Sequence, residues 1–105
     1  MKVLVTDLDG NTHEIEGKSG WTLMEIIRDA GLPIKAECGG ACACATCHVY
    51  VDDDWLDASG TRSEEEEDMI DLALEVADNS RLSCQIEMSD ALDGIKVTLA
   101  RDAVL

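Results

Sequence analysis

The pattern of hydrophobic and polar residues at the start of the chain is typical of β-strands. Lys2–Asp7 is rich in β-branched residues, and Thr12–Glu16 alternates between polar and apolar positions. The residues between them include Asp9 and Gly10, a pair typical of the tight turn that joins antiparallel strands. The pattern therefore predicts that the chain begins with a β-hairpin.

The next hydrophobic positions follow a helical period instead. They fall at i, i+3, i+4 and i+7, on one helix face, and they are Leu23, Ile26, Ile27 and Ala30. Thr22 and Glu25 have the spacing of a capping box, in which each side chain bonds the other residue's backbone N–H. Gly31 is placed to end the helix, and Pro33 prevents it from resuming.

A second capping box, Ser63 with Glu66, predicts another helix that runs to about Val76. Its expected buried stripe consists of Met69, Leu72, Ala73 and Val76.

Three further segments have strand character, and they are His48–Val51, Leu82–Ile86 and Ile95–Leu99. Asp52–Arg62 is polar and is expected to be a connector, and Asp93-Gly94 is expected to form a turn. Strands and helices are thus interleaved in mixed order, which favours an α+β fold over a wound parallel sheet.

The length of 105 residues suits one small domain, expected to span residues 1–105. Eight Lys and Arg residues face 23 Asp and Glu residues, which gives a formal net charge of −15. Such a chain is repelled by the phosphates of nucleic acid and by anionic membrane surfaces, so a partner with a basic surface is the natural complement. No signal-peptide pattern and no apolar run of membrane-spanning length is visible, so we expect a cytoplasmic protein, or else a mature form whose presequence has been removed. We also expect a monomer.

Five cysteines carry the candidate chemistry, at positions 38, 42, 44, 47 and 84. The residues from Gly39 to Thr46 are almost all small, which lets a backbone wrap closely round an inorganic cluster and point N–H groups at its sulfurs. Four thiolates suit either an iron–sulfur cluster or structural zinc. Three cysteines on one loop with a remote fourth are similar to the arrangement in two-iron ferredoxins.

Two alternatives remain open at this point. A structural zinc site usually brings two closely spaced cysteine pairs, but Cys84 has no nearby Cys or His, so His13 or His48 would have to contribute. A disulfide oxidoreductase that uses Cys44 and Cys47 is disfavoured, because no βαβ pattern surrounds this pair.

The complete cysteine pattern resembles that of the adrenodoxin/putidaredoxin family of 2Fe–2S ferredoxins. Five residues separate Cys38 from Cys44, two separate Cys44 from Cys47, and Cys84 lies within the segment Ser80-Arg81-Leu82-Ser83-Cys84-Gln85. The resemblance extends over the Ala45–Val49 and Asp68–Ala73 segments and covers essentially the whole chain. It implies a β-grasp (ubiquitin-like) fold with a cluster-binding loop and an acidic interaction helix.

By position, the resemblance assigns Cys38, Cys44, Cys47 and Cys84 as the cluster ligands. Cys42 falls where the family has a small or apolar residue that is not a ligand, so we interpret it as a packing residue of the loop, with a spare thiol as the alternative. His48 follows a ligand directly and is expected to be a buried structural residue held by backbone groups.

An acidic stripe marks the second helix, at Glu64, Asp68, Asp71 and Glu75. Taken alone, such a stripe is most simply a solvated face. In the family this helix docks onto basic patches, and the matching residues here are Glu64, Glu65, Asp68 and Asp71. The C-terminal residues 101–105 lack the terminal aromatic residue of putidaredoxin.

The resemblance implies an electron carrier and not an enzyme. Its cofactor would be a 2Fe–2S cluster, its donor a flavoprotein NAD(P)H-dependent ferredoxin reductase, and its acceptor a cytochrome P-450-type monooxygenase. An alternative within the family is electron supply for iron–sulfur cluster assembly. From a different class, a zinc-stabilised β-grasp interaction module without a redox role is the other alternative.

Overall fold

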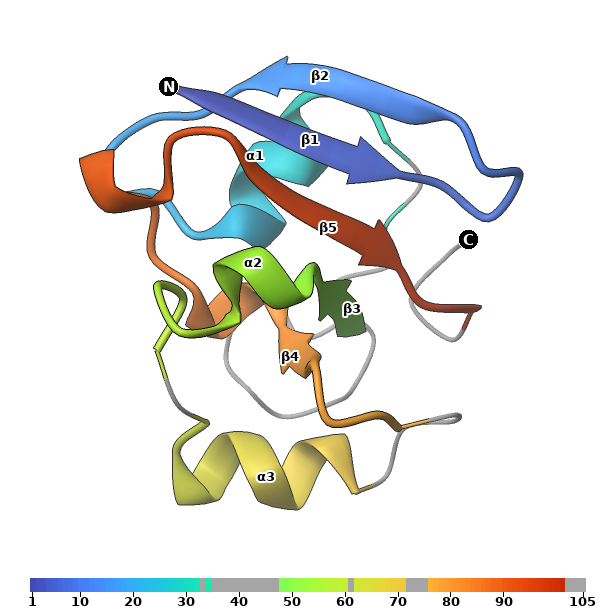
Figure 1. Cartoon of the computed structure of the whole chain (residues 1–105), viewed down its shortest axis with the longest axis vertical. Coiled ribbons are helices and arrows are strands. Elements are labelled where there is room, and N and C mark those ends of the chain that lie inside the picture. Colours follow the sequence, from blue (N-terminus) through green and yellow to red (C-terminus); the bar gives the residue numbers. More distant parts are fainter. Residues whose placement is uncertain (33, 35–47, 61, 72–75, 102–105) are drawn as a thin grey trace.

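The structure is a computed structural model, and it describes residues 1–32, 34, 48–60, 62–71 and 76–101. Five strands form one sheet (Figure 1), and their bounds are β1 Lys2–Thr6, β2 Thr12–Glu16, β3 His48–Val51, β4 Ser80–Leu82 and β5 Ile95–Leu99. The α-helices are α1 Leu23–Asp29, α2 Asp53–Leu56 and α3 Glu64–Ile70. Two further elements among the described residues are the short 3₁₀ turns η1 Ser83–Gln85 and η2 Asp90–Leu92. None of the helices described is long and apolar enough to cross a membrane.

The strand order across the sheet is β2-β1-β5-β3-β4. β1 pairs antiparallel with β2 and parallel with β5, which in turn pairs antiparallel with β3. A first hairpin, a helix packed across the sheet and a last strand inserted beside the first constitute the β-grasp arrangement. The prediction of an α+β, β-grasp fold is therefore confirmed.

One face of the sheet is hydrophobic because side chains alternate along each strand. In β5, Ile95, Val97 and Leu99 are buried while Lys96 and Thr98 are exposed. The buried faces of the other strands and of α1, which lies behind the sheet in Figure 1, complete the core. They contribute Val3, Val5, Val49, Val51, Leu23, Met24, Ile26 and Ile27.

The hairpin, the capping box and the end of the first helix near Gly31 are confirmed, whereas Ala30, the last position of the expected apolar face, is the exposed C-cap of α1. The capping box of α1 forms in both directions, with the Glu25 N–H donating to the Thr22 hydroxyl and the Thr22 N–H donating to the Glu25 carboxylate. The helix ends before Gly31, whose φ of +83° lies in the left-handed region that favours glycine. Pro33 lies outside the described residues.

The hairpin turn contains a side-chain contact between His13 and Asp7 that the sequence did not indicate. The His13 ring has its Nε2 2.8 Å from the Asp7 carboxylate. The same carboxylate accepts the backbone N–H groups of Asn11 and Asp9. The hydrogen bond from His13, followed by that from Asn11, lowers the pKa of Asp7 below its ordinary value of 3.8. Asp7 is therefore part of the turn and not a freely solvated charge.

Two expectations about the middle and end of the chain are corrected. The polar connector Asp52–Arg62 contains the short helix α2, which begins where the Asp52 side chain accepts the N–H of Asp54. The strand expected at Leu82–Ile86 is instead β4, Ser80–Leu82, followed by η1. It ends early because the chain leaves β3 there and crosses to α1, where the Ile86 carbonyl accepts the N–H of Leu23.

The second predicted helix begins as expected but differs in its end and its buried face. Ser63 caps α3, whose last residue is Ile70, and at Val76 the backbone is no longer helical. Leu72 and Ala73 lie outside the described residues. Of the remaining expected stripe, Met69 is half-buried and Val76 is 44% exposed. The buried residues of α3 are instead Glu66 and Ile70.

Replacing Thr22 by Ala should remove the side-chain acceptor of the α1 cap. We expect the free energy of unfolding to fall by about 1 kcal/mol, the usual cost of losing such a cap. The comparison is the thermal midpoint of the cluster-loaded protein, with Ser19→Ala as the control because Ser19 is exposed and lies outside the helix. Equal midpoints for Thr22→Ala and the unchanged protein would show that the cap contributes nothing.

Candidate functional site

Of the four cysteines predicted as ligands, the structure describes Cys84. Cys38, Cys44 and Cys47, together with Cys42, lie outside the described residues. Cys84 sits in the middle of η1 and is 5% exposed. The side-chain amide of Gln85 has its Nε2 3.6 Å from the Cys84 sulfur and 3.4 Å from the Cys84 carbonyl oxygen. A buried sulfur that accepts an N–H group is what a cluster thiolate requires, so this residue fits an iron–sulfur ligand.

His48 is fully buried at the start of β3, directly after Cys47. It lies opposite Leu82 in the pairing of β3 with β4. Its Nε2 is 2.8 Å from the Ser80 hydroxyl, which also accepts the N–H of Ala77. The expected buried position is confirmed, and the contact with Ser80 is a side-chain contact that the sequence did not indicate. This contact ties the strand that follows Cys47 to the strand that precedes Cys84.

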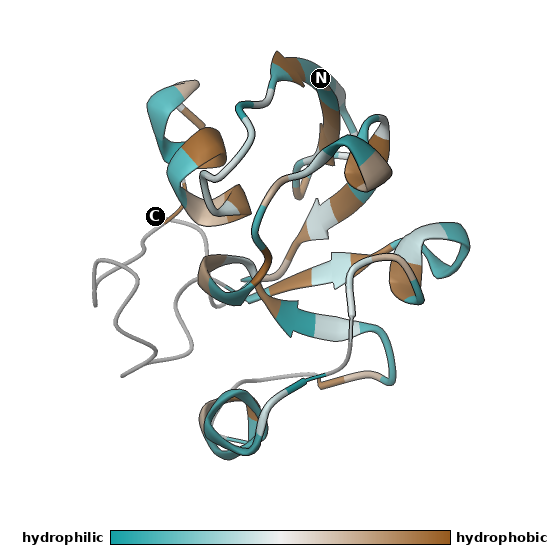
Figure 2. Ribbon diagram, turned by 90° about the vertical axis from the view of Figure 1, so that its left-hand side faces the viewer, coloured by the Kyte–Doolittle hydropathy of each residue, from teal (hydrophilic) through white to brown (hydrophobic). Residues whose placement is uncertain are grey.

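The four predicted docking residues are all exposed. Glu64, Glu65 and Asp68 belong to α3, and Asp71 is its C-cap. In Figure 2 the ribbon of α3 is mostly hydrophilic in colour, at the edge of the molecule, and in Figure 1 it lies at the end away from the β1–β2 hairpin. The structure therefore brings the acidic residues together on one accessible helix. Glu75, the last residue of the expected stripe, lies outside the described residues.

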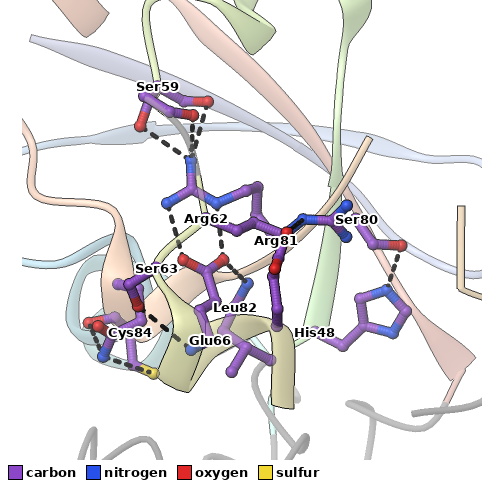
Figure 3. A network of polar contacts seen from close by, with 12 residues as sticks. His48, Ser59, Arg62, Ser63, Glu66, Ser80, Arg81, Leu82 and Cys84 are labelled. Atoms are coloured by element: carbon purple, nitrogen blue, oxygen red, sulfur yellow. Dashed lines mark hydrogen bonds and ion pairs between the residues drawn. The ribbon is translucent and has the colours of Figure 1, made fainter. Parts of the chain in front are cut away.

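A buried ion pair joins this helix to the strand that leads to Cys84 (Figure 3). The Arg81 guanidinium donates from Nε to the Glu66 carboxylate at 2.6 Å and from Nη2 at 3.0 Å. The same carboxylate accepts the backbone N–H of Leu82 at 2.9 Å. Arg81 Nη1 donates to the carbonyl oxygens of Ser59 and Gly60. The two side chains are 4% and 1% exposed, so both charges are removed from water and compensated by protein groups.

The sequence analysis missed this pair because it assigned Glu66 to a capping box. Ser63 does accept the N–H of Glu66, but the Glu66 carboxylate turns inward to Arg81. The burial of a guanidinium requires a carboxylate, and this requirement outweighs the small gain from completing a cap. One signal was available, since Arg81 is the single charged residue between Asn79 and Ile86.

Comparison with known proteins shows which family this arrangement represents. Residues 6–89 match the family model described as the 2Fe–2S iron–sulfur cluster binding domain. The chain belongs to the 2Fe–2S ferredoxins. The cofactor of this ferredoxin is therefore a 2Fe–2S cluster, as predicted, in place of the zinc alternative.

Relatives narrow the ferredoxin to the adrenodoxin/putidaredoxin type. It is 47% identical to ferredoxin CarAc of Sphingomonas over 96% of its own length and 94% of the relative's. It is 42% identical to the mitochondrial adrenodoxin homolog of Saccharomyces cerevisiae, over 94% of its length and 58% of that longer protein. Among solved structures, putidaredoxin in a covalent complex with putidaredoxin reductase superposes with a TM-score of 0.91 at 40% identity, covering 94% of this chain and 97% of that one.

Breaking the buried pair should be strongly destabilising. We expect Arg81→Met to cost about 3–5 kcal/mol of unfolding free energy, because it leaves the Glu66 carboxylate buried without a counter-charge. The double variant Glu66→Met with Arg81→Met should recover much of that loss. The measurement is thermal unfolding of the unchanged protein, Arg81→Met, the double variant and the exposed control Glu64→Met. A single variant as stable as the unchanged protein would contradict a buried, coupled pair.

Proposed function

We propose that this ferredoxin carries single electrons from a flavoprotein NAD(P)H-dependent ferredoxin reductase to a cytochrome P-450-type monooxygenase. One structural observation supports the proposal. The buried ion pair between Glu66 and Arg81 joins the exposed acidic helix α3 to the segment that leads to Cys84. A carrier needs a surface for transient docking and a redox centre at a fixed place relative to it. The solved complex of the similar putidaredoxin with its reductase supports the choice of donor.

Within this proposal, the cluster is held by Cys38, Cys44, Cys47 and Cys84, and the chain acts as a single carrier domain that catalyses no reaction of its own. When bound, the cluster supplies a site that accepts and releases one electron. The side chain of Gln85 and the small residues of the Gly39–Thr46 segment would offer N–H groups to sulfur, which favours the more negative reduced form. His48 is a positioning residue, since it links the two ligand-bearing segments through Ser80.

The acidic residues Glu64, Glu65, Asp68 and Asp71 form the proposed docking surface for both partners. With a net charge of −15, the chain attracts a basic partner from a distance, and these exposed carboxylates orient it. Both partners would use the surface in turn, so one carrier shuttles between them. The experiment that tests the function is reconstitution of NAD(P)H oxidation coupled to substrate hydroxylation, using purified reductase, this ferredoxin and a P-450. Hydroxylation that proceeds equally well without the ferredoxin would contradict it.

Single replacements of the ligand cysteines by Ser should remove the visible charge-transfer absorption or make it labile. Cys42→Ser should leave it intact, because Cys42 is proposed to pack within the loop. The absorption spectrum of each purified variant is the measurement. A colourless Cys42→Ser variant together with a stable Cys38→Ser variant would overturn the ligand assignment, and the double variant tests whether Cys42 replaces a lost ligand.

Neutralising Asp68 and Asp71 together, to Asn, should weaken binding to the reductase and the acceptor without changing the absorption spectrum. The rate at limiting ferredoxin should also fall as salt rises from about 0.05 to 0.5 M, because the Debye length shortens from roughly 14 to 4 Å. Reduction kinetics with each partner measure both effects.

The matched control is Asp29→Asn with Asp90→Asn. It removes the same charge from exposed positions on α1 and η2. Asp7 is unsuitable as a control because it binds His13 in the hairpin turn. Equal losses in the two double variants would mean that total charge, and not a surface on α3, governs association.

A further inference from the structure

A groove lies beside α3. It consists of two cavities of about 340 Å³ each, and both are lined by Arg62, Glu67 and Asp78. Because they share these three residues, the cavities adjoin. Leu56 and Asp57 extend the first, and Asp71 and Val76 are among the residues that extend the second.

The charged side chains that line this groove are mostly acidic among the described residues. Among the described lining residues, the carboxylates are Asp57, Glu67, Asp71 and Asp78, and the cations are Arg62 and Arg81. Arg81 is bound to Glu66, and its side chain is only 4% exposed. Arg62 is therefore the accessible cation among the lining residues that the structure describes. Its Nε lies 3.9 Å from the Glu67 carboxylate, and the two side chains are 26% and 57% exposed.

At this distance and exposure, an incoming cation can displace Arg62 from Glu67. A long, partly exposed ion pair contributes about 0–1 kcal/mol, so an incoming cation loses little by displacing it. The buried pair beneath it could not be exchanged in this way, since both of its partners are shielded from water. Val76, which is 44% exposed, offers an apolar contact to the methylene stem of an incoming basic side chain.

We propose that Arg62 is a specificity-determining residue that occupies the acidic groove until an arginine side chain of the partner displaces it from Glu67. This inference rests on the proposed docking function and adds a requirement to it. A diffuse basic surface that faces α3 is repelled by Arg62. A partner with a guanidinium placed to enter the groove exchanges one ion pair for another. It also gains a contact with the carboxylate of Asp57 or Asp78. Arg62 thus weakens association with unsuitable polycations more than association with a fitting partner.

The first test uses a short all-arginine peptide and the cluster-loaded protein at about 0.05 M salt. Arg62→Ala should bind the peptide about two- to fivefold more tightly, the factor expected from removing one weakly held competing cation. Arg28→Ala is the matched control, because it removes the same charge from an exposed position in the last turn of α1. Equal gains for Arg62→Ala and Arg28→Ala would overturn the inference, since only total charge would then matter.

A mutant cycle with Glu67→Gln tests the competition directly. In the Glu67→Gln background, the gain from Arg62→Ala should shrink markedly, because the carboxylate for which the two cations compete is gone. A gain of unchanged size in that background would contradict the displacement.

Reduction by a flavoprotein ferredoxin reductase separates this inference from the proposed function. If the reductase reduces the protein but Arg62→Ala and Arg28→Ala give equal gains in peptide binding, the groove inference fails and the carrier function stands. If the reductase does not reduce the protein but the peptide results hold, the carrier function fails while the competition at Glu67 is supported.

Discussion

The burial of the Arg81 guanidinium constrains the part of the molecule that contains α3 and the Leu82–Cys84 segment. Arg81 enters the interior from β4, and Glu66 must follow it from α3 because an uncompensated buried charge is too costly. The same carboxylate accepts the N–H of Leu82, two residues before Cys84. The inward side of α3 is thereby fixed against the segment that carries a proposed ligand, and its outward side is left for carboxylates that face solvent.

A second tie lies nearby and acts on the other ligand-bearing segment. His48, next to Cys47, is buried and contacts Ser80, the residue before Arg81. Three consecutive residues of β4 therefore hold β3, the interior ion pair and α3 together. In the proposed carrier function, these links would keep the docking surface on α3 at a fixed distance from the redox centre, and Arg62 would disfavour polycations that do not fit the groove.

Much of the fold could be predicted because its signals are local. The hairpin, the capping box at Thr22 and Glu25, and the end of α1 at Gly31 each depend on residues a few positions apart. The inward turn of Glu66 could not be predicted in this way, since its partner lies 15 residues along the chain and Ser63 offered a plausible local role. The cysteine pattern identified the family, yet the groove at Arg62 depends on tertiary placement that spacing alone does not show.

The central claim is that α3 and the Leu82–Cys84 segment unfold locally as one unit, because the Glu66 side chain of α3 binds Arg81 and the N–H of Leu82. Amide hydrogen exchange of the cluster-loaded protein, resolved by residue with mass spectrometry, tests it most directly. We expect the amides of Ile70 and Leu82 to share one protection factor and to lose protection together in Glu66→Gln, while the amides of β1 keep theirs. If Ile70 lost protection in Glu66→Gln while Leu82 kept it, the helix and the cysteine segment would be independent and the claim would be wrong.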